Sequence, residues 1–592
     1  MHDVPVITNP DLEVLRLNKE NGYNYRQRRH EDWTTNYTLG RDKVITNRLT
    51  QRQSVNLPLM KLTLKTLLKD MDDMPVLYFE NLDNNKEAEI FKNEHWKYTG
   101  EENNFELQDI VDKKQEFYFG RSFDQWQIVD GKVKMTVQDP MDMLVDRYMD
   151  PFNLHSSRFL IHTHIFMTLS DIEKTPGYDK KAIKNLKIFH ATQAGLIKAK
   201  TNLEMLQAKN QKMADMGLID VDYPVLGETY VEISLHFVYD KREKSSDEEL
   251  FLKVECDDMD ILMIKPLEEV IGRTKDHFFR NHFPYVSWAG DLERQDFWSD
   301  GTADMVRTPN NILNAWFSQL VENRTLKNLN MNLFNSSIEW FVPQTWQPQA
   351  WGMYGIPVPV GGKIDDVFKQ MPVSDLTESL DEVNFLISMI EKATGATPTQ
   401  QGAKTPGQVT LGEVELTLGE AKERVKGVSK FYTQAWKDRG LMYIKLLEAA
   451  GNKIDAVKIY KKGRNTDNIY EKEIAPKDWK SEAGYRCKVW SQDERNAENT
   501  DSLQRANAAK TVMPDNPIVD TVYKRKVLEF SDFAPDELNE AMKYEEEKRN
   551  MMMQQAQAQP GMAGGQGVLP AQQSLPPAPQ GQLPEQPPPI IQ

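Results

Sequence analysis

The sequence predicts an α+β protein, because helical and strand patterns occupy separate stretches instead of alternating as βαβ units. Residues 1–300 combine helices with several strands, and a charged helical end closes the chain. Between them, two helices with apolar stripes flank a β-rich segment at 330–374, and a long helical pattern follows. The length also predicts more than one domain.

The composition excludes several classes of protein. The chain has 592 residues, 39% hydrophobic and 27% charged, which is enough apolar material for a core. Its net charge of −16 argues against a surface that binds nucleic acid non-specifically. Two cysteines, Cys256 and Cys487, exclude a disulfide framework and form no CxxC metal motif. We expect no signal peptide, no transit peptide and no membrane span, because no run of about 18 apolar residues occurs.

The first 300 residues contain strong local signals. Helices are expected over 9–70, with a break at Pro58, over 84–97 and after 106. The pair Asp130-Gly131 predicts a hairpin turn between two strands that end near 137. Further predictions are strands at 74–80 and 157–166, one Lys-rich helix at 178–209, two strands within 229–256, and a strand at 260–266 that continues their sheet.

Two helices with apolar stripes are predicted on either side of the β-rich segment. Residues 299–328 are predicted to be a helix pair, within which Thr308 and Pro309 have the spacing of an N-cap and a first helical residue. Asp375 and Glu378 have the spacing of a capping box. The first stripe is Ile312, Leu313, Trp316, Phe317, Leu320 and Val321, and the second is Leu376, Leu380, Val383, Ile387 and Ile390.

The segment between these helices is rich in aromatic residues, Pro and Gly. Its short strands carry Trp340, Trp346, Trp351 and Tyr354. Aromatic residues at this density suit either the core of a small β subdomain or a protein interface, where aromatics are enriched. The position of the segment between two amphipathic helices favours an interface.

A polar loop, GATPTQQGAKTPGQV (395–409), separates the second striped helix from the long helix. Gly395 is suited to a left-handed helix end, and Pro398 and Pro406 block helix continuation. Lys404 is the single charged residue of the loop. Loops of this length without structure of their own are usually functional or disordered.

The C-terminal third begins with a helix over 410–451, on the order of 60 Å long at ~1.5 Å per residue. Strands are expected within 454–491, and charged helices within 497–550. From 551 the chain is rich in Gln, Gly and Pro, and this composition predicts disorder to residue 592.

No pattern of an active site is found. Gly402-Ala-Lys-Thr405 departs from the Walker motif, since Ala403 separates Gly from Lys and a helix precedes the loop. His162 and His164 alternate on a predicted strand and would share one face, but a third metal ligand is missing from the pattern. The carboxylates Asp257, Asp258 and Asp260 are interpreted as a solvated turn between strands. We therefore expect no catalytic residues, no metal and no cofactor.

The order of elements resembles that of the portal protein (head–tail connector) of tailed bacteriophages. The matching stretches are FPYVSWAGDLERQDFWSDGTADMVRTPNNILNAWFSQLVENR (283–324) and EKATGATPTQQGAKTPGQVTLGEVELTLGEAKERV (391–425). The resemblance implies a portal-type fold with these parts: wing, 1–300, with its long helix 410–451 and β return 452–496; stem helices, 301–329 and 375–394; clip, 330–374; tunnel loop, 395–409; crown, 497–550; disordered tail, 551–592.

The resemblance further implies a structural protein of the virion rather than an enzyme. It would be made in the host cytoplasm and form a homo-oligomeric ring, a dodecamer, at one capsid vertex. Viral DNA packaging and genome ejection would pass double-stranded DNA through its channel without sequence preference. The implied protein partners are the terminase large subunit, tail adaptor proteins, the major capsid protein and a scaffold protein.

Residue roles follow from position in the resemblance. The tunnel-loop residues facing DNA would be Thr397, Thr399, Gln400, Gln401, Gly402, Lys404, Thr405 and Gln408, and the partner-binding residues of the clip would be Trp340, Trp346, Trp351 and Tyr354. Two alternatives stay open. One is a nucleic-acid-processing enzyme or packaging ATPase of a phage, which would need paired metal-binding carboxylates or a Walker loop. The other is a scaffold or adaptor that binds partners through the Pro/Gln tail.

Overall fold

The computed structural model describes most of the chain as mixed α+β with several sheets, as the sequence predicts. It divides into two units, 1–501 and 502–592, and the boundary falls inside helix α13 (Gln492–Val512). The described residues are 10–41, 55–70, 74–83, 85–216, 227–241, 248–291, 296–328, 332–334, 362–363, 368–370, 379–394, 411–462, 469–490, 492–513 and scattered positions from 519 to 551.

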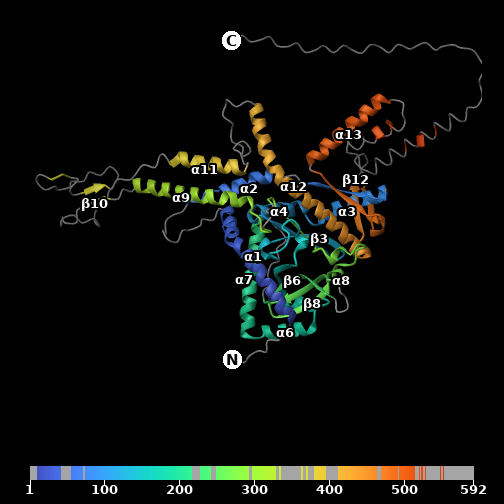
Figure 1. The fold of residues 1–592 in the computed structure, drawn as a ribbon, viewed down its shortest axis with the longest axis horizontal. Coiled ribbons are helices and arrows are strands. Elements are labelled where there is room, and N and C mark those ends of the chain that lie inside the picture. The colour runs from blue at the N-terminus through green and yellow to red at the C-terminus, as the bar shows by residue number, and fades with distance from the viewer. Residues whose placement is uncertain are drawn as a thin grey trace, which may run out of the picture. The chain divides into compact units, whose positions relative to one another are not determined.

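A five-stranded antiparallel sheet is the largest sheet of the first unit (Figure 1). Helix α1 (Pro10–Gly40) packs Leu12 and Leu15 against apolar side chains on one face of it. The strand predictions at 157–166, 229–256 and 260–266 are confirmed. In spatial order the strands are β4 (Met143–Val145), β5 (Phe159–Thr168), β6 (Tyr230–Lys241), β7 (Glu248–Cys256) and β8 (Asp260–Pro266).

The predicted hairpin is also present, as β2 (Ser122–Val129) and β3 (Lys132–Gln138). Asp130 and Gly131 have φ of 50° and 74°, the two positive values that a type I′ turn requires. Strand β9 (Tyr285–Trp288) adds to the other edge of β2. Helix α4 (Phe105–Phe119) packs against β2 and contributes Val111 and Phe119 to the main core.

The C-terminal β return pairs with the N-terminal region. Strand β14 (Tyr485–Trp490) is antiparallel to β1 (Val76–Asn81), with Cys487 opposite Phe79. Helix α3 (Lys86–Glu102) packs against this pair, and its Trp96 stacks edge-on against Phe79 at 5.6 Å between ring centroids. The strands β12 (Val457–Lys462) and β13 (Ile469–Ile474) form a separate hairpin. The strand predictions within 454–491 are confirmed.

The remaining helices include the predicted striped helices and the long helix. Helices α9 (Thr302–Asn328) and α11 (Ser379–Thr394) contact one another along their length (Figure 1). Helix α12 (Leu411–Ala450) confirms the predicted long helix, and Gly451 ends it with a φ of 53°. The others are α2 (Leu59–Asp70), α5 (Leu169–Lys174), α6 (Lys180–His190), α7 (Gln193–Met216) and α8 (Leu267–Ile271).

Two helix predictions were wrong. The single helix at 178–209 is two helices, because the chain turns at Ala191–Thr192, where Thr192 Oγ1 donates to the Phe189 carbonyl (2.6 Å). The first striped helix begins at Thr302, so Pro309 lies inside it. Asp304 stabilises the earlier start by accepting the Gly301 N–H at 2.9 Å. Pro309 leaves the Met305 carbonyl without a helical donor, and Met305 is exposed to water.

Candidate functional site

The residues predicted for the tunnel loop and the clip lie outside the described part of the chain, and so do Asp375, Glu378 and the tail beyond 551. What the structure defines is the set of elements that carry the two segments. These are the α9–α11 pair, the short strands between them, and α12.

The α9–α11 pair has one buried and one exposed apolar face. Leu313 of α9 and Val383 and Ile390 of α11 are buried in the main core cluster, which confirms these members of the predicted stripes. Phe385 and Met389 of α11 point outward and are 64% and 47% exposed. The two side chains are four residues apart and share one helix face.

The aromatic segment between the two helices is closed at its base. Strand β10 (Asn332–Phe334) is antiparallel to β11 (Phe368–Gln370), with Phe334 opposite Phe368. The two ends of the intervening segment are therefore held together.

Helix α12 is anchored by a buried guanidinium. Arg439 donates from Nη2 to Asp112 Oδ2 and from Nε to Asp124 Oδ2, both at 2.6 Å, and the three side chains are almost fully buried. Trp288 Nε1 donates to the same Asp112 oxygen at 2.6 Å. Burial disfavours the charged form of Arg439, but Asp112 and Asp124 hold its pKa above the ordinary value. The network links α12 to α4, β2 and β9.

Acidic residues on α4 form the other side of this anchor. Asp109, Asp112 and Glu116 recur at three and four residues, so they lie on one helix face. Asp109 accepts from Tyr432 of α12 and from Lys113 Nζ at 2.7 Å. Burial raises the pKa of Glu116 to about 8, and the nearby Asp112 adds to this effect. The sequence predicted an acidic helix after 106, but its pattern gave no sign that this acidic face would be buried against α12.

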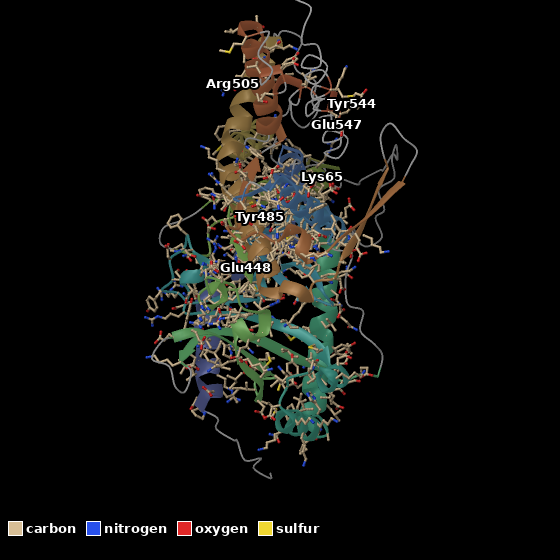
Figure 2. The ribbon with its side chains drawn as sticks, turned by 90° about the vertical axis from the view of Figure 1, so that its right-hand side faces the viewer. Lys65, Glu448, Tyr485, Arg505, Tyr544 and Glu547 are labelled. Atoms are coloured by element: carbon tan, nitrogen blue, oxygen red, sulfur yellow. The ribbon has the colours of Figure 1, made fainter. Side chains whose placement is uncertain are left out.

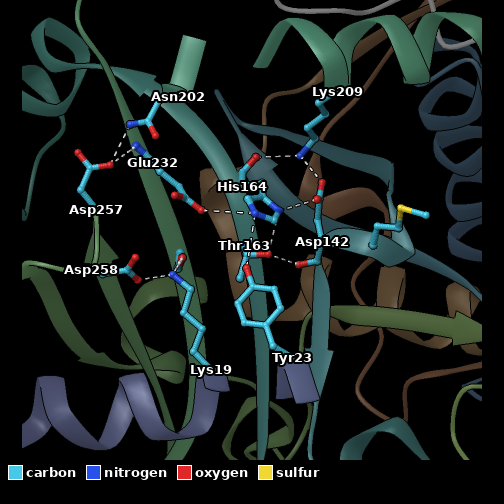
Figure 3. Close-up of polar contacts among 12 residues, drawn as sticks. Lys19, Tyr23, Asp142, Thr163, His164, Asn202, Lys209, Glu232, Asp257 and Asp258 are labelled. Carbon is cyan, nitrogen blue, oxygen red and sulfur yellow. Dashed lines mark hydrogen bonds and ion pairs between the residues drawn. The ribbon is translucent and has the colours of Figure 1, made fainter. Parts of the chain in front are cut away.

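A second polar cluster lies between α1, β5, β6 and α7 (Figure 3). Asp142 accepts from His164 Nδ1 at 2.9 Å and pairs with Lys209 Nζ at 2.7 Å. Burial disfavours the Asp142 carboxylate, yet Lys209 and His164 hold its pKa well below the usual range. Lys209 also donates to the His164 carbonyl at 3.0 Å, which fixes α7 to the strand.

The two strand histidines do not share a face, so that prediction was wrong. A β-bulge follows His162, and His164 has a φ of 55°. The extra residue breaks the alternation of the strand. His162 Nδ1 therefore lies 3.0 Å from Tyr285 Oη, whereas His164 lies beside Asp142. Burial lowers the pKa of His162 to about 3.

The interpretation of 257–260 as a solvated turn was wrong for Asp257. Its carboxylate is buried and accepts from Asn202 Nδ2 at 2.9 Å, from His190 Nε2 at 2.8 Å and from the Glu232 N–H at 3.0 Å. Asp257 is covered because His190 of α6 and Asn202 of α7 bind its carboxylate. Asp258 forms an ion pair with Lys19 at 2.6 Å (Figure 3).

A third buried charge lies where α3 meets the C-terminal return. Lys92 Nζ is 5.0 Å from the ring centre of Tyr443 and 5.2 Å from that of Tyr485. Burial lowers the pKa of Lys92 to about 7, against a smaller opposite effect of Glu448. Figure 2 shows Tyr485 and Glu448 on the same side of the molecule. The two rings attract the ammonium form. Because Tyr443 belongs to α12 and Tyr485 to β14, this lysine joins both elements to α3.

These clusters connect elements instead of presenting reactive groups to solvent. Across the described ranges, no group of three or more His, Cys, Asp or Glu side chains is arranged to hold a metal ion. The helices that the structure describes include none long and apolar enough to cross a membrane. No protein-family model matches this chain, and no curated protein matches it.

Proposed function

We propose that this chain is the portal protein of a tailed bacteriophage, the ring subunit through which double-stranded DNA enters and leaves the capsid. One observation carries the proposal. Two contacting helices, α9 and α11, are separated by a segment whose ends pair as β10 and β11, and a 40-residue helix follows. This order corresponds to the stem, clip and long helix that the resemblance implies. The loop 395–409 would join the second stem helix to α12.

The anchorage of α12 supports a role in positioning that loop. Arg439 lies 28 residues after Leu411, so a straight helix would carry the loop end about 42 Å from the buried network. A helix fixed at one end by two charged hydrogen bonds can hold a loop at a defined place. The loop itself has Lys404 as its one charge, so a ring of loops would make weak contacts with phosphate.

The exposed face of the helix pair supports assembly. Phe385 and Met389 would be covered by the stem of a neighbouring copy in a ring, since aromatic residues and Met are enriched in interfaces. A head-to-tail contact of this kind closes into a ring when its rotation closes. The same proposal includes a location in the virion. It also includes the terminase large subunit, the tail adaptors and the major capsid protein as partners.

The first test is the mass of the purified particle. Twelve copies of the 68.4 kDa chain would weigh about 820 kDa. Native mass spectrometry with negative-stain images is expected to show a ring of that size with a central channel. A monomer over a wide concentration range would refute the proposal.

The second test addresses the channel loop. Lys404→Glu is expected to reduce DNA packaging or retention, and to do so more at low ionic strength, where screening is weaker. Lys134→Glu is the matched control, because Lys134 is an exposed residue of the β2–β3 hairpin. Equal behaviour of both variants at low salt would remove the electrostatic role of the loop.

The third test addresses the clip. Phe334 and Phe368 are paired, so an Asn-Gly turn can replace 335–367 and leave the ladder intact. The shortened chain is expected to form rings that bind neither terminase nor tail adaptor. Normal binding of both would exclude this segment as the docking site.

A further inference from the structure

The corner between α6 and α7 carries an exposed aliphatic patch. Ile188 lies in the last turn of α6, and Leu196 and Ile197 lie in the first turn of α7. They are 59%, 61% and 63% exposed. Single exposed aliphatic residues are ordinary on a protein surface, but here three of them fall within ten residues at one tight corner.

Three lysines beside this patch have no acidic partner. Lys180, Lys181 and Lys184 are exposed, and within the described residues no carboxylate lies within 4.0 Å of their ammonium groups. Lys184 is four residues before Ile188, so basic and aliphatic side chains share a helix face. The other lysines of the two helices are paired: Lys187 with Glu173, Lys198 with Glu232, Lys200 with Glu204, Lys209 with Asp142, and Lys212 with Asp139.

The corner is held rigidly on the sheet. His190 lies between two acceptors: its Nε2 is 2.8 Å from Asp257 Oδ2 and its Nδ1 is 3.1 Å from the Gly195 carbonyl oxygen. Gly195 packs so closely on the backbone of Phe189 that any side chain there would overlap it. The exposed side chains therefore belong to a fixed surface, and a ligand would lose little free energy in ordering it.

We propose that this corner docks an acidic amphipathic segment of another protein, with aliphatic side chains against Ile188, Leu196 and Ile197 and carboxylates against the three lysines. An apolar centre with a charged rim is the ordinary anatomy of a protein interface. In a chain of net charge −16, a local excess of positive charge selects acidic partners by attraction.

The side chains of the corner favour an acidic protein segment over two other negatively charged ligands, single-stranded nucleic acid and an anionic membrane. Single-stranded nucleic acid is held by aromatic stacking as well as by cations, and the patch offers aliphatic groups instead. Helices that lie on membranes carry Trp, Phe or Leu along a large apolar face, whereas the exposed large apolar side chains of α6 and α7 are confined to the corner. Phe189, the one aromatic residue of α6 and α7, is partly covered. The proposal is independent of the portal assignment.

The test is binding of a defined peptide to the full chain. The probe is a fluorescein-labelled helix of about 18 residues with leucines at three- and four-residue spacing and glutamates elsewhere. Fluorescence anisotropy is expected to show binding that weakens with salt. The same peptide with lysine in place of glutamate is expected to bind at least about tenfold more weakly.

Two variants separate charge from apolar contact. Lys180→Glu with Lys181→Glu and Lys184→Glu, and separately Leu196→Ser with Ile197→Ser, are each expected to weaken binding at least about tenfold. The control reverses three exposed lysines elsewhere, and it is expected to change affinity less than about twofold. Its residues are Lys97, Lys134 and Lys453.

Several outcomes would overturn the proposal. These are absence of peptide binding, equal loss in the control, and equal binding of the lysine peptide. Binding of the chain to vesicles with 30% anionic lipid, or to duplex DNA, that the Lys180/Lys181/Lys184 variant abolishes would assign the corner to a membrane or to nucleic acid. Loss of self-association in that variant would assign it to a second copy of this chain.

Discussion

Arg439→Met is expected to destabilise the first unit strongly. Methionine has a similar length but leaves the carboxylates of Asp112 and Asp124, which now accept from the guanidinium at 2.6 Å, buried without their shared cation. Breaking a buried pair in this way costs about 3–5 kcal/mol. For a large domain, at about 2 °C per kcal/mol, the melting temperature should fall by roughly 6–10 °C.

The assay is thermal unfolding followed by tryptophan fluorescence. Trp436 is a local reporter, because the Arg439 guanidinium lies 4.6 Å from its ring centre. Lys445→Met is the matched control, because Lys445 lies on the same helix as Arg439 and pairs with the exposed Asp276 of the loop after α8, and such exposed pairs contribute at most about 1 kcal/mol.

A third variant separates two causes of destabilisation: the uncompensated charges of the buried carboxylates and the loss of the Arg439 contacts themselves. Arg439→Met combined with Asp112→Asn and Asp124→Asn removes the uncompensated charges, and it should recover part of the stability. If Arg439→Met melted within about 1 °C of the unmodified protein, or no lower than the Lys445→Met control, the buried network would not stabilise the fold as expected.

Two further predictions concern buried positions beside α12. Because the pKa of Glu116 is raised to about 8 from 4.5, the folded state holds this proton more tightly, and the resulting stability is lost as the pH rises from about 4.5 through 8. Glu116→Gln should remove this pH dependence. In urea unfolding, the free energy of unfolding of the variant should therefore rise relative to that of the unmodified protein by on the order of 4 kcal/mol across this window. A constant difference between the two proteins would show that Glu116 is already ionised. A Cβ at Gly440 would overlap Cys487 Sγ and Leu77 Cδ2. Gly440→Ala should therefore lower the free energy of unfolding by about 1–3 kcal/mol despite its better helix propensity, and a stabilised variant would contradict this packing.

Local chemistry made several elements predictable. The Asp130-Gly131 turn was recognised because few residue pairs tolerate two positive φ angles. The long helix was predicted at 410–451 and spans Leu411–Ala450, since its periodicity and its terminal glycine are properties of neighbouring residues. The strands of the β6–β8 meander follow from the same kind of signal.

Predictions failed where a distant contact outweighed a local preference. Pro309 has the spacing of a helix start, but contacts of Asp304 with Arg29 and Asn36 of α1 support a start seven residues earlier. Regular alternation along the strand would put His164 on the same face as His162. The β-bulge after His162 instead turns His164 toward Asp142. The proximity of three aspartates suggested a solvated turn, and the covering helices made Asp257 a buried acceptor.

The sequence by itself determined the α+β class, the order of the elements, the two striped helices around an aromatic segment, and the long helix. Each of these depends on residues a few positions apart. Only the tertiary structure decided that β14 pairs with β1, that Arg439 of α12 meets Asp112 and Asp124, and that the corner of α6 and α7 keeps three lysines without partners. The first two facts depend on segments hundreds of residues apart. Their contacts become favourable only after burial has removed water from both partners, and no local pattern contains that information.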